Sequence, residues 1–166
     1  MTVEEYLRLD YEKDIDKIVQ YNRELTARYP WLIPGHGDSL YAYDSDYDFH
    51  YTMLDDLPDG WRIAFGEDIC KEIDDVLRKY DYVDSYSIVQ IKEKYGALRW
   101  YNCGLPAGLF EEINAIIDKY EKISERTCIV CGKPAKFITT GWICPWCEDC
   151  INKTNDKVVP IEEYFK

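Results

Sequence analysis

The sequence predicts an α+β fold with three helices, a small antiparallel β-sheet and a cysteine-rich C-terminal subdomain. Three observations lead to this prediction. Apolar residues recur at helical spacing in three separate stretches, two β-rich runs flank a short turn that contains glycine, and two C-x-x-C pairs lie close to the C-terminus. The order of these features favours an α+β domain over residues 1–124 and a second unit over residues 125–166.

The first helix is expected over residues 3–29. From Asp14 onward the apolar residues follow helical spacing, so Asp10 or Asp14 can start the segment, and Pro30 ends it. The following residues, 30–60, are repeatedly interrupted by proline and glycine and are the least predictable part of the chain. Within them, aromatic and polar residues alternate over 47–53, which predicts a short, half-buried strand.

A second helix is expected from Asp59 to Tyr80. Asp59 is a suitable N-cap residue, an apolar stripe follows it, and Gly66 marks a position where the helix can break. Cys70 lies beside the apolar stripe, which favours a buried small hydrophobic residue over a reactive nucleophile.

A β-hairpin follows, with strands over residues 86–92 and 97–102. The connection between them contains Gly96, which can adopt the positive φ that a tight hairpin turn requires. After a loop with glycine and proline, residues 109–124 show the cleanest amphipathic pattern of the chain and predict the third helix.

The C-terminal cysteines have the spacing of a metal site. Cys128 and Cys131 form one C-x-x-C pair, Cys147 and Cys150 form a second, and fifteen residues separate the pairs. Two thiolates three positions apart can face one ion at about 2.3 Å, so two pairs can complete a tetrahedron around Zn²⁺. Four thiolates leave no open position for water or substrate, so we expect one structural zinc ion rather than a catalytic one.

Cys144 leaves an alternative ligand set open. Cys144 and Cys147 also form a C-x-x-C pair, with twelve residues between Cys131 and Cys144. The pair Cys147 and Cys150 is preferred because a short helix can begin at Cys150. Backbone N–H groups at the start of a helix stabilise thiolates.

The residues around the cysteines predict the rest of the subdomain. Residues 136–143 are expected to form two short strands that turn near Thr140 and Gly141. A knuckle, a hairpin and a helix that carries the last ligand pair resemble a zinc-ribbon or treble-clef unit. Because this unit follows the third helix directly, we expect it to dock on that helix.

Composition and charge exclude several classes of function. A hydrophobic share of 46% indicates a folded protein, and the formal net charge of −12 argues against binding to a phosphate backbone. No apolar run approaches the roughly 18 residues of a membrane span, and the polar, acidic start of the chain does not resemble a secretory signal. Because four of the seven cysteines look like metal ligands rather than disulfide partners, a cytoplasmic location is expected.

An acidic, tyrosine-rich segment over residues 36–61 is the candidate surface for a protein partner. Aromatic side chains anchor interfaces, and a run of aspartates steers a basic partner. The D-x-D-x-D pattern inside it resembles the start of a calcium loop, but phenylalanine occupies the position that requires glycine, which favours a solvated acidic loop. The candidate partner-binding residues are Tyr43, Asp44, Asp46, Tyr47, Asp48 and His50.

The hairpin offers an alternative function, a nucleotide or nucleic-acid site over residues 90–101. The basic residues there are the candidate phosphate-binding groups, and the aromatic side chains of Tyr95 and Trp100 beside them could stack on bases. The candidate phosphate-binding residues are Lys92, Lys94 and Arg99.

The sequence contains no P-loop, nucleophile elbow or dinucleotide-binding fingerprint. Either histidine, His36 or His50, could pair with Cys70 or Cys103 as base and nucleophile, but no local signature supports such a pair. A non-catalytic protein is therefore expected.

Three segments carry a family resemblance when they are taken in order. They are PDGWRIAFG (58–66), QIKEKYGALRWY (90–101) and RTCIVCGKPA (126–135). Together they resemble a family of uncharacterised proteins from bacteriophages and prophages, over most of residues 20–153. The resemblance implies a small accessory protein in the cytoplasm of a bacterial host. Since small acidic phage proteins often bind and block a host protein, such as a defence component, we expect a non-catalytic, zinc-stabilised protein-interaction module.

Overall fold

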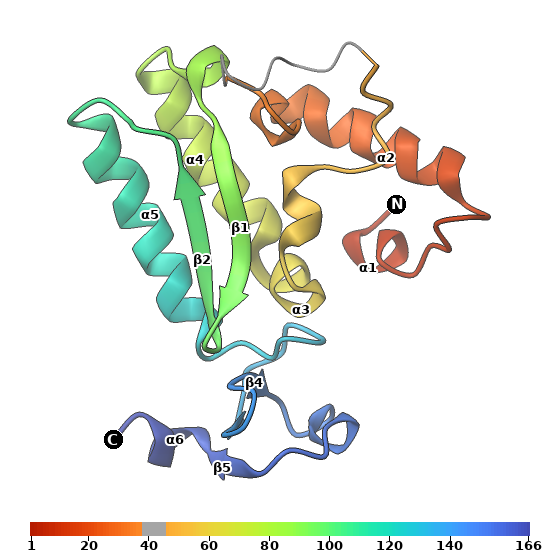
Figure 1. Ribbon diagram of the computed structural model, residues 1–166, viewed down its shortest axis with the longest axis vertical. Helices are drawn as coiled ribbons and strands as arrows, with labels where there is room; N and C mark the ends of the chain where they lie inside the picture. Colours follow the sequence, from red (N-terminus) through yellow and green to blue (C-terminus); the bar gives the residue numbers. More distant parts are fainter. Residues whose placement is uncertain (38–45) are drawn as a thin grey trace.

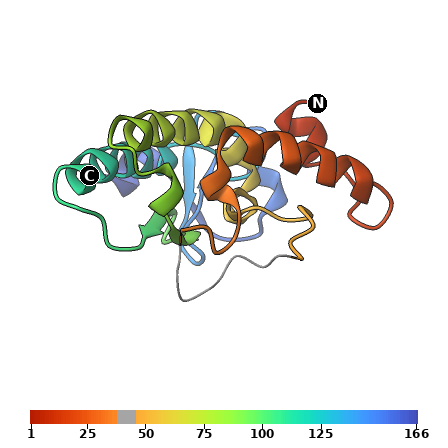
Figure 2. The same ribbon diagram turned by 90° about the horizontal axis from the view of Figure 1, so that it is seen from above.

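The computed structural model describes residues 1–37 and 46–166, and it confirms the predicted α+β class (Figure 1). The part of the chain that precedes the cysteine-rich subdomain is called the main body. It contains an antiparallel hairpin of β1 (Ile88–Lys94) and β2 (Ala97–Asn102). Figure 2 shows the long helices side by side on one side of this hairpin, so the main body has two layers. These helices are α2 (Ile15–Arg28), α4 (Glu67–Lys79) and α5 (Leu109–Ser124).

The N-terminal segment forms two helices, so one continuous helix over 3–29 is wrong, whereas the predicted start at Asp14 is confirmed for the second of them. Helix α1 (Val3–Tyr6) is followed by a turn-rich link, and α2 begins after its N-cap residue, Asp14. Within the link, the Asp10 carboxylate accepts two backbone N–H groups at 3.0 and 3.2 Å. Such local bonds compete with helical ones and interrupt the helix. The predicted helix end before Pro30 is confirmed.

The strand predicted over 47–53 is wrong. Phe49 has a φ of +65°, which lies in the left-handed region and is incompatible with an extended strand. Thr52 and Asp55 form a capping box, in which the Asp55 carboxylate accepts the Thr52 N–H at 2.6 Å. This cap starts a 3₁₀ turn, η2 (Met53–Asp56), which lies beside β1 without pairing with it.

The helix predicted over 59–80 is continuous but changes its winding. It begins as α3 (Asp59–Trp61), passes through a π-helical segment, η3 (Arg62–Gly66), and continues as α4. The predicted N-cap role of Asp59 is wrong, because Pro58 occupies that position and Asp59 is the first helical residue. The expected break takes the form of the wider π-helical turn and does not interrupt the helix.

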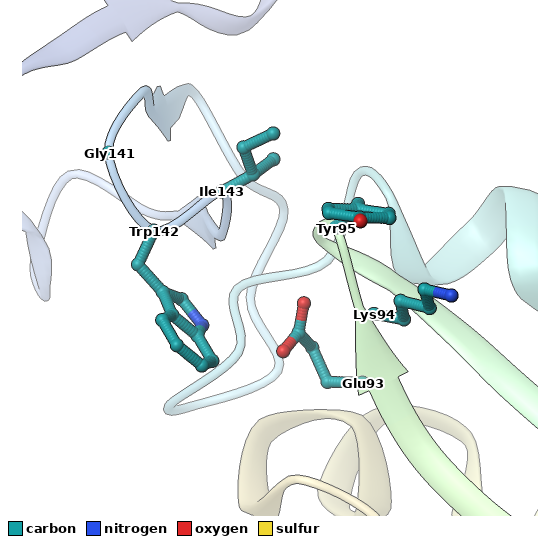
Figure 3. Close-up of a pocket in the computed structure, with 6 residues that line it drawn as sticks. All are labelled: Glu93, Lys94, Tyr95, Gly141, Trp142 and Ile143. Carbon is teal, nitrogen blue, oxygen red and sulfur yellow. The ribbon is translucent and has the colours of Figure 1, made fainter.

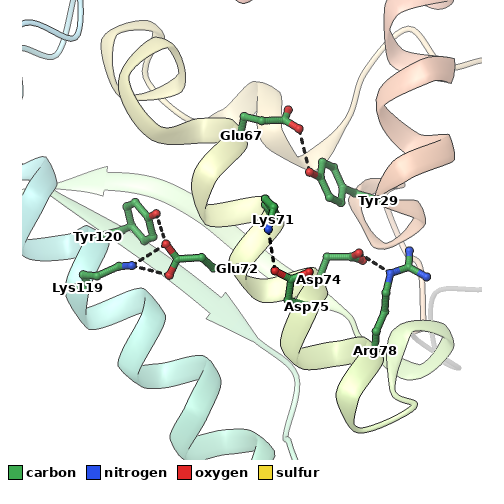
Figure 4. A network of polar contacts seen from close by, with 9 residues as sticks. All are labelled: Tyr29, Glu67, Lys71, Glu72, Asp74, Asp75, Arg78, Lys119 and Tyr120. Atoms are coloured by element: carbon green, nitrogen blue, oxygen red, sulfur yellow. Dashed lines mark hydrogen bonds and ion pairs between the residues drawn. The ribbon is translucent and has the colours of Figure 1, made fainter.

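Side chains of α4 connect this helix to both of its neighbours (Figure 4). At the end of α2, the Tyr29 hydroxyl donates to the Glu67 carboxylate at 2.8 Å. On the other side, the Glu72 carboxylate accepts the Tyr120 hydroxyl at 2.7 Å and the Lys119 ammonium at 2.6 Å, both from α5. These contacts hold the helix layer together around the apolar core.

The predicted hairpin and the third predicted helix are confirmed. Tyr95 and Gly96 at the hairpin turn both have positive φ, +55° and +78°, as type I′ turns require. Helix α5 has the predicted bounds, and it packs with α4 against the inner face of the hairpin. The largest fully buried side chains of the core include Trp31, Trp61, Arg62, Tyr86, Ile91 and Leu98.

The C-terminal subdomain contains a three-stranded antiparallel sheet in the order β4-β3-β5. Of the two strands predicted over 136–143, the first is confirmed as β3, whereas the second begins later. The Thr139 hydroxyl accepts the Cys144 N–H at 2.9 Å, which keeps the intervening residues in a turn. The strands are β3 (Phe137–Thr139), β4 (Pro145–Trp146) and β5 (Val158–Pro160).

The short helix predicted to begin at Cys150 is a single 3₁₀ turn, η5 (Ile151–Lys153). The chain then returns through β5 to α6 (Ile161–Tyr164). Within residues 1–37 and 46–166, no helix is long and apolar enough to cross a membrane. In the described part of the chain, the remaining 3₁₀ turns are η1 (Pro30–Leu32) and η4 (Val83–Ser85).

Candidate metal centre

The first cysteine pair lies on a tight knuckle. The Cys128 N–H donates to the Lys133 carbonyl at 2.8 Å, and the Gly132 N–H donates to the Cys128 carbonyl at 3.0 Å. Gly132 has a φ of +77°, a conformation that glycine adopts without steric cost. This turn brings the side chains of Cys128 and Cys131 to the same side of the chain.

The second pair lies at the start of η5. The N–H groups of Cys150 and Ile151 both donate to the Cys147 carbonyl, at 3.3 and 3.1 Å. These bonds fold the chain between Cys147 and Cys150 into one turn, which is the geometry that a C-x-x-C pair needs in order to face one ion.

The structure brings the four predicted ligands together. Their Sγ atoms all lie within 4.8 Å of one another, and those of Cys131 and Cys147 are 3.5 Å apart. A tetrahedral zinc site with bonds of about 2.3 Å has sulfur–sulfur edges of about 3.8 Å. Cys128, Cys147 and Cys150 are buried, and Cys131 is half-buried. Four sulfur donors in this arrangement fit Zn²⁺, which would be held by Cys128, Cys131, Cys147 and Cys150.

Cys144 lies outside this cluster. Its backbone N–H bonds to the Thr139 hydroxyl, and its side chain is buried near the hairpin. Burial raises the pKa of the Cys144 thiol to about 12, and the nearby Glu93 and Asp156 carboxylates add to this shift. Because Cys144 is not among the four clustered sulfur atoms, the geometry favours the pair Cys147 and Cys150.

The cysteine subdomain contacts both α3 and the hairpin tip. At the first, the Gly60 N–H donates to the Ile129 carbonyl at 2.9 Å, and the Trp61 indole N–H donates to the Thr127 carbonyl at 3.0 Å. At the second, the hairpin tip meets the β3–β4 turn, where a Cβ at Gly96 would lie 3.0 Å from the side chain of Ile143. The contacts with α3 and the hairpin thus add to the direct chain connection from α5 (Figure 1).

The candidate partner-binding residues are only partly described. Tyr43 and Asp44 lie outside the described residues. Asp46 is exposed, and the Tyr47 hydroxyl donates to the Tyr51 carbonyl. The Asp48 carboxylate and the His50 ring nitrogen Nδ1 contact each other. The end of the predicted 36–61 surface, however, belongs to the core. Its buried residues are Thr52, Leu54, Leu57, Gly60 and Trp61.

The candidate phosphate-binding residues do not form a common cluster. Arg99 forms an ion pair with Glu121 of α5. Lys92 and Lys94 place their ammonium groups over the rings of Tyr101 and Tyr95, at 5.6 and 5.4 Å from the ring centres. The predicted stacking role of Trp100 is wrong, because its side chain is only 4% exposed.

Of the residues considered for covalent catalysis, Cys70 is buried, and His36 and His50 make local contacts. Cys70 is fully buried, as predicted, and burial raises its thiol pKa far above neutrality. The ring nitrogen Nδ1 of His36 lies 2.9 Å from the Tyr86 carbonyl, and that of His50 contacts Asp48.

A pocket that was not predicted from the sequence lies between the hairpin tip and the β3–β4 turn (Figure 3). It has a volume of about 330 Å³ and is lined by residues 93–95 and 141–143. Tyr95 and Trp142 are each 71% exposed, the highest value among the large hydrophobic side chains of the described residues. The sequence signal for this pocket was Trp142 next to Gly141, in the turn between the two cysteine pairs.

No family model, curated protein or solved structure matches this chain. The resemblance to phage and prophage proteins therefore stays a prediction. The fold and the site define the chain as an α+β protein with a C-terminal four-cysteine cluster that could hold one metal ion.

Proposed function

We propose that this protein is a non-catalytic protein-interaction module whose C-terminal subdomain is stabilised by one structural Zn²⁺. The observation that carries the proposal is the closed cluster of four cysteine side chains, packed against α3. The chemistry that zinc supplies here is cross-linking: it ties together two turns that share only a small apolar core.

A structural role follows from the donor set. Four thiolates satisfy the tetrahedral preference of Zn²⁺ and leave no position for water or substrate. Cys128 at the centre of the knuckle is completely buried, and the Ile129 and Thr127 carbonyls beside it accept hydrogen bonds from α3. The cluster thus fixes the surface of the subdomain rather than reacting with a ligand.

The charge of the chain supports a protein partner with basic groups. A net charge of −12 attracts basic surfaces and repels phosphate backbones. The alternative function is nucleotide or nucleic-acid binding at the hairpin 90–101. Because Arg99 is paired with Glu121, one of the three cations considered for that function is already neutralised. Lys92 and Lys94 remain for that alternative, and a gel shift that weakens steeply with salt would support it.

The biological setting is proposed from the sequence resemblance alone. We place the protein in the cytoplasm of a bacterium, as a phage or prophage accessory protein that binds and inhibits a host protein, such as a defence component. The acidic composition is in keeping with such a role.

Two measurements test the proposal together. Elemental analysis of the full chain, purified without added metal, should find one zinc per chain. Affinity capture from bacterial lysate, followed by mass spectrometry, should recover a protein that Cys128→Ser does not recover. The absence of zinc would refute the metal assignment. Identical proteins captured by the wild type and by Cys128→Ser would refute the zinc-stabilised module.

A further inference from the structure

The pocket between the hairpin tip and the β3–β4 turn has features that neither the metal centre nor the core explains. Its two rims come from different parts of the chain, Tyr95 on the hairpin and Trp142 on the C-terminal subdomain (Figure 3). Both aromatic side chains are 71% exposed. Leaving such large apolar surfaces in water is unfavourable, and exposed aromatic groups gathered at a concave site are typical of binding surfaces.

The relative position of the two rims is fixed. The Gly96 φ of +78° and the close approach of Ile143 place the hairpin tip directly against the turn. On the opposite rim, the Thr139 hydroxyl bonds to the Trp142 carbonyl and to the Cys144 N–H, which holds the turn in shape. The pocket is therefore built on ordered backbone in both elements.

The charged residues that line the pocket are Glu93 and Lys94, and the Lys94 ammonium lies 5.4 Å from the centre of the Tyr95 ring. In Figure 3 the Glu93 carboxylate points between the rings of Trp142 and Tyr95, whereas the ammonium group of Lys94 points to the other side of the strand. One Glu93 oxygen accepts the Gly96 N–H at 2.7 Å, so the carboxylate is held in place and keeps further lone pairs for a ligand. The Asp156 carboxylate is outside the lining of the pocket and lies 3.8 Å from the position that a Cβ would take at Gly141.

We propose that this pocket binds an arginine side chain of a protein partner. A guanidinium group is planar, so it can stack on the Trp142 indole while it donates hydrogen bonds to the Glu93 carboxylate. The net charge of −12 complements such a ligand and opposes the phosphate groups that would accompany a stacked base. This inference deepens the proposed protein-interaction function and rests on it.

The test is a titration of the zinc-containing full chain with arginine whose amino and carboxyl ends are both blocked. Binding is monitored by ¹H–¹⁵N NMR. The indole N–H signal of Trp142 is identified by its loss in Trp142→Leu. We expect this signal and the Gly96 amide to shift saturably, with a dissociation constant on the order of 10 mM for a single side chain. Blocked citrulline has the same shape without the charge, and it should shift neither signal.

Matched variants distinguish binding in the pocket from nonspecific attraction of arginine to the net negative charge of the protein. Glu93→Gln keeps an oxygen acceptor for the Gly96 N–H but removes the charge, and it should weaken arginine binding by at least about threefold. Glu12→Gln removes the same charge from an exposed position in the loop before α2, and it should leave the affinity unchanged. Trp142→Leu should abolish the saturable shift of Gly96.

Several results would overturn the inference. They are shifts that do not saturate, equal shifts with citrulline, and equal weakening by Glu93→Gln and Glu12→Gln. A single-stranded DNA hexamer that shifts the Trp142 signal at lower concentration than arginine does would assign the pocket to nucleic acid instead. If arginine binding fails while partner capture succeeds, this pocket is refuted but the proposed function stands. Failed capture refutes the proposed function, whatever the titration shows.

Discussion

Gly60→Ala should detach the cysteine knuckle from α3. A Cβ at position 60 would lie 2.1 Å from the Cys128 carbonyl oxygen and 2.7 Å from the Ile129 carbonyl oxygen. Ordinary contacts begin near 3.4 Å, so the knuckle must move by roughly 1 Å. Both contacts are with backbone, which cannot rotate out of the way as a side chain could.

The cost of this substitution can be worked out from the contacts that move. The shift weakens the Gly60 N–H bond to Ile129 and the Trp61 indole bond to Thr127. Each such bond contributes about 0.5–1.5 kcal/mol, and overpacking costs about 1–3 kcal/mol. We therefore expect a loss of about 2–4 kcal/mol in the free energy of unfolding. For a chain of this length, that loss corresponds to a fall of about 5–15 °C in the melting temperature.

Gly66→Ala is the matched control on the same helical stretch. A Cβ there would lie 3.2 Å from the Cγ of Arg62, which is a side-chain atom and can shift by a few tenths of an ångström. Alanine also restricts the unfolded chain more than glycine does, which offsets the crowding. We expect the free energy of unfolding to change by less than about 1 kcal/mol.

Urea denaturation followed by circular dichroism measures both variants, and elemental analysis shows whether the metal content is unchanged. Zinc retained by Gly60→Ala would place the defect in docking rather than in the cysteine cluster. If Gly60→Ala and Gly66→Ala have the same urea midpoint, the contact between the knuckle and α3 contributes nothing to stability and the reasoning is refuted.

Three further outcomes are expected. Cys128→Ser should lose the zinc and Cys144→Ser should retain it, as measured by elemental analysis; the reverse result would contradict the ligand assignment. Zinc release to a chromogenic chelator should increase as the pH falls below about 6, because protons compete with the metal for the thiolates; release independent of pH would exclude thiolate ligands. Asp55→Ala should lower the free energy of unfolding by about 3–5 kcal/mol, because it leaves the buried Arg62 without its carboxylate. Asp55→Leu combined with Arg62→Met should restore much of that loss in urea denaturation, and an equal loss in both would contradict this explanation.

Local patterns that agree with their tertiary surroundings made part of the fold predictable. Helix α5 has the predicted bounds because its apolar residues keep helical spacing from Leu109 onward and its buried residues lie on that stripe. The hairpin was predictable because Tyr95-Gly96 supplies the turn chemistry that its strands need. The cysteine cluster was predictable because the spacing of C-x-x-C pairs follows from metal–sulfur geometry.

Two of the wrong predictions, the continuous first helix and the strand over 47–53, failed because local hydrogen bonds and backbone conformation overrode periodicity. The Asp10 carboxylate captures backbone N–H groups and interrupts the first helix. The left-handed Phe49 and the cap at Thr52 remove the strand that the alternation of residues predicted. Gly141-Trp142 alone did not predict the pocket, because its two rims come from segments almost fifty residues apart in the chain.

The metal centre and the pocket are linked through a short stretch of chain. Trp142 and Ile143 precede Cys147 by only a few residues, and β4 lies between the pocket and the cluster. Because the side chain of Ile143 packs against Gly96, a cluster that fixes Cys147 also fixes the distance between the two aromatic rims. A metal ion held by this cluster would therefore control binding without touching the ligand. On this reasoning, removal of the metal should abolish arginine binding even where α2, α4 and the hairpin stay folded.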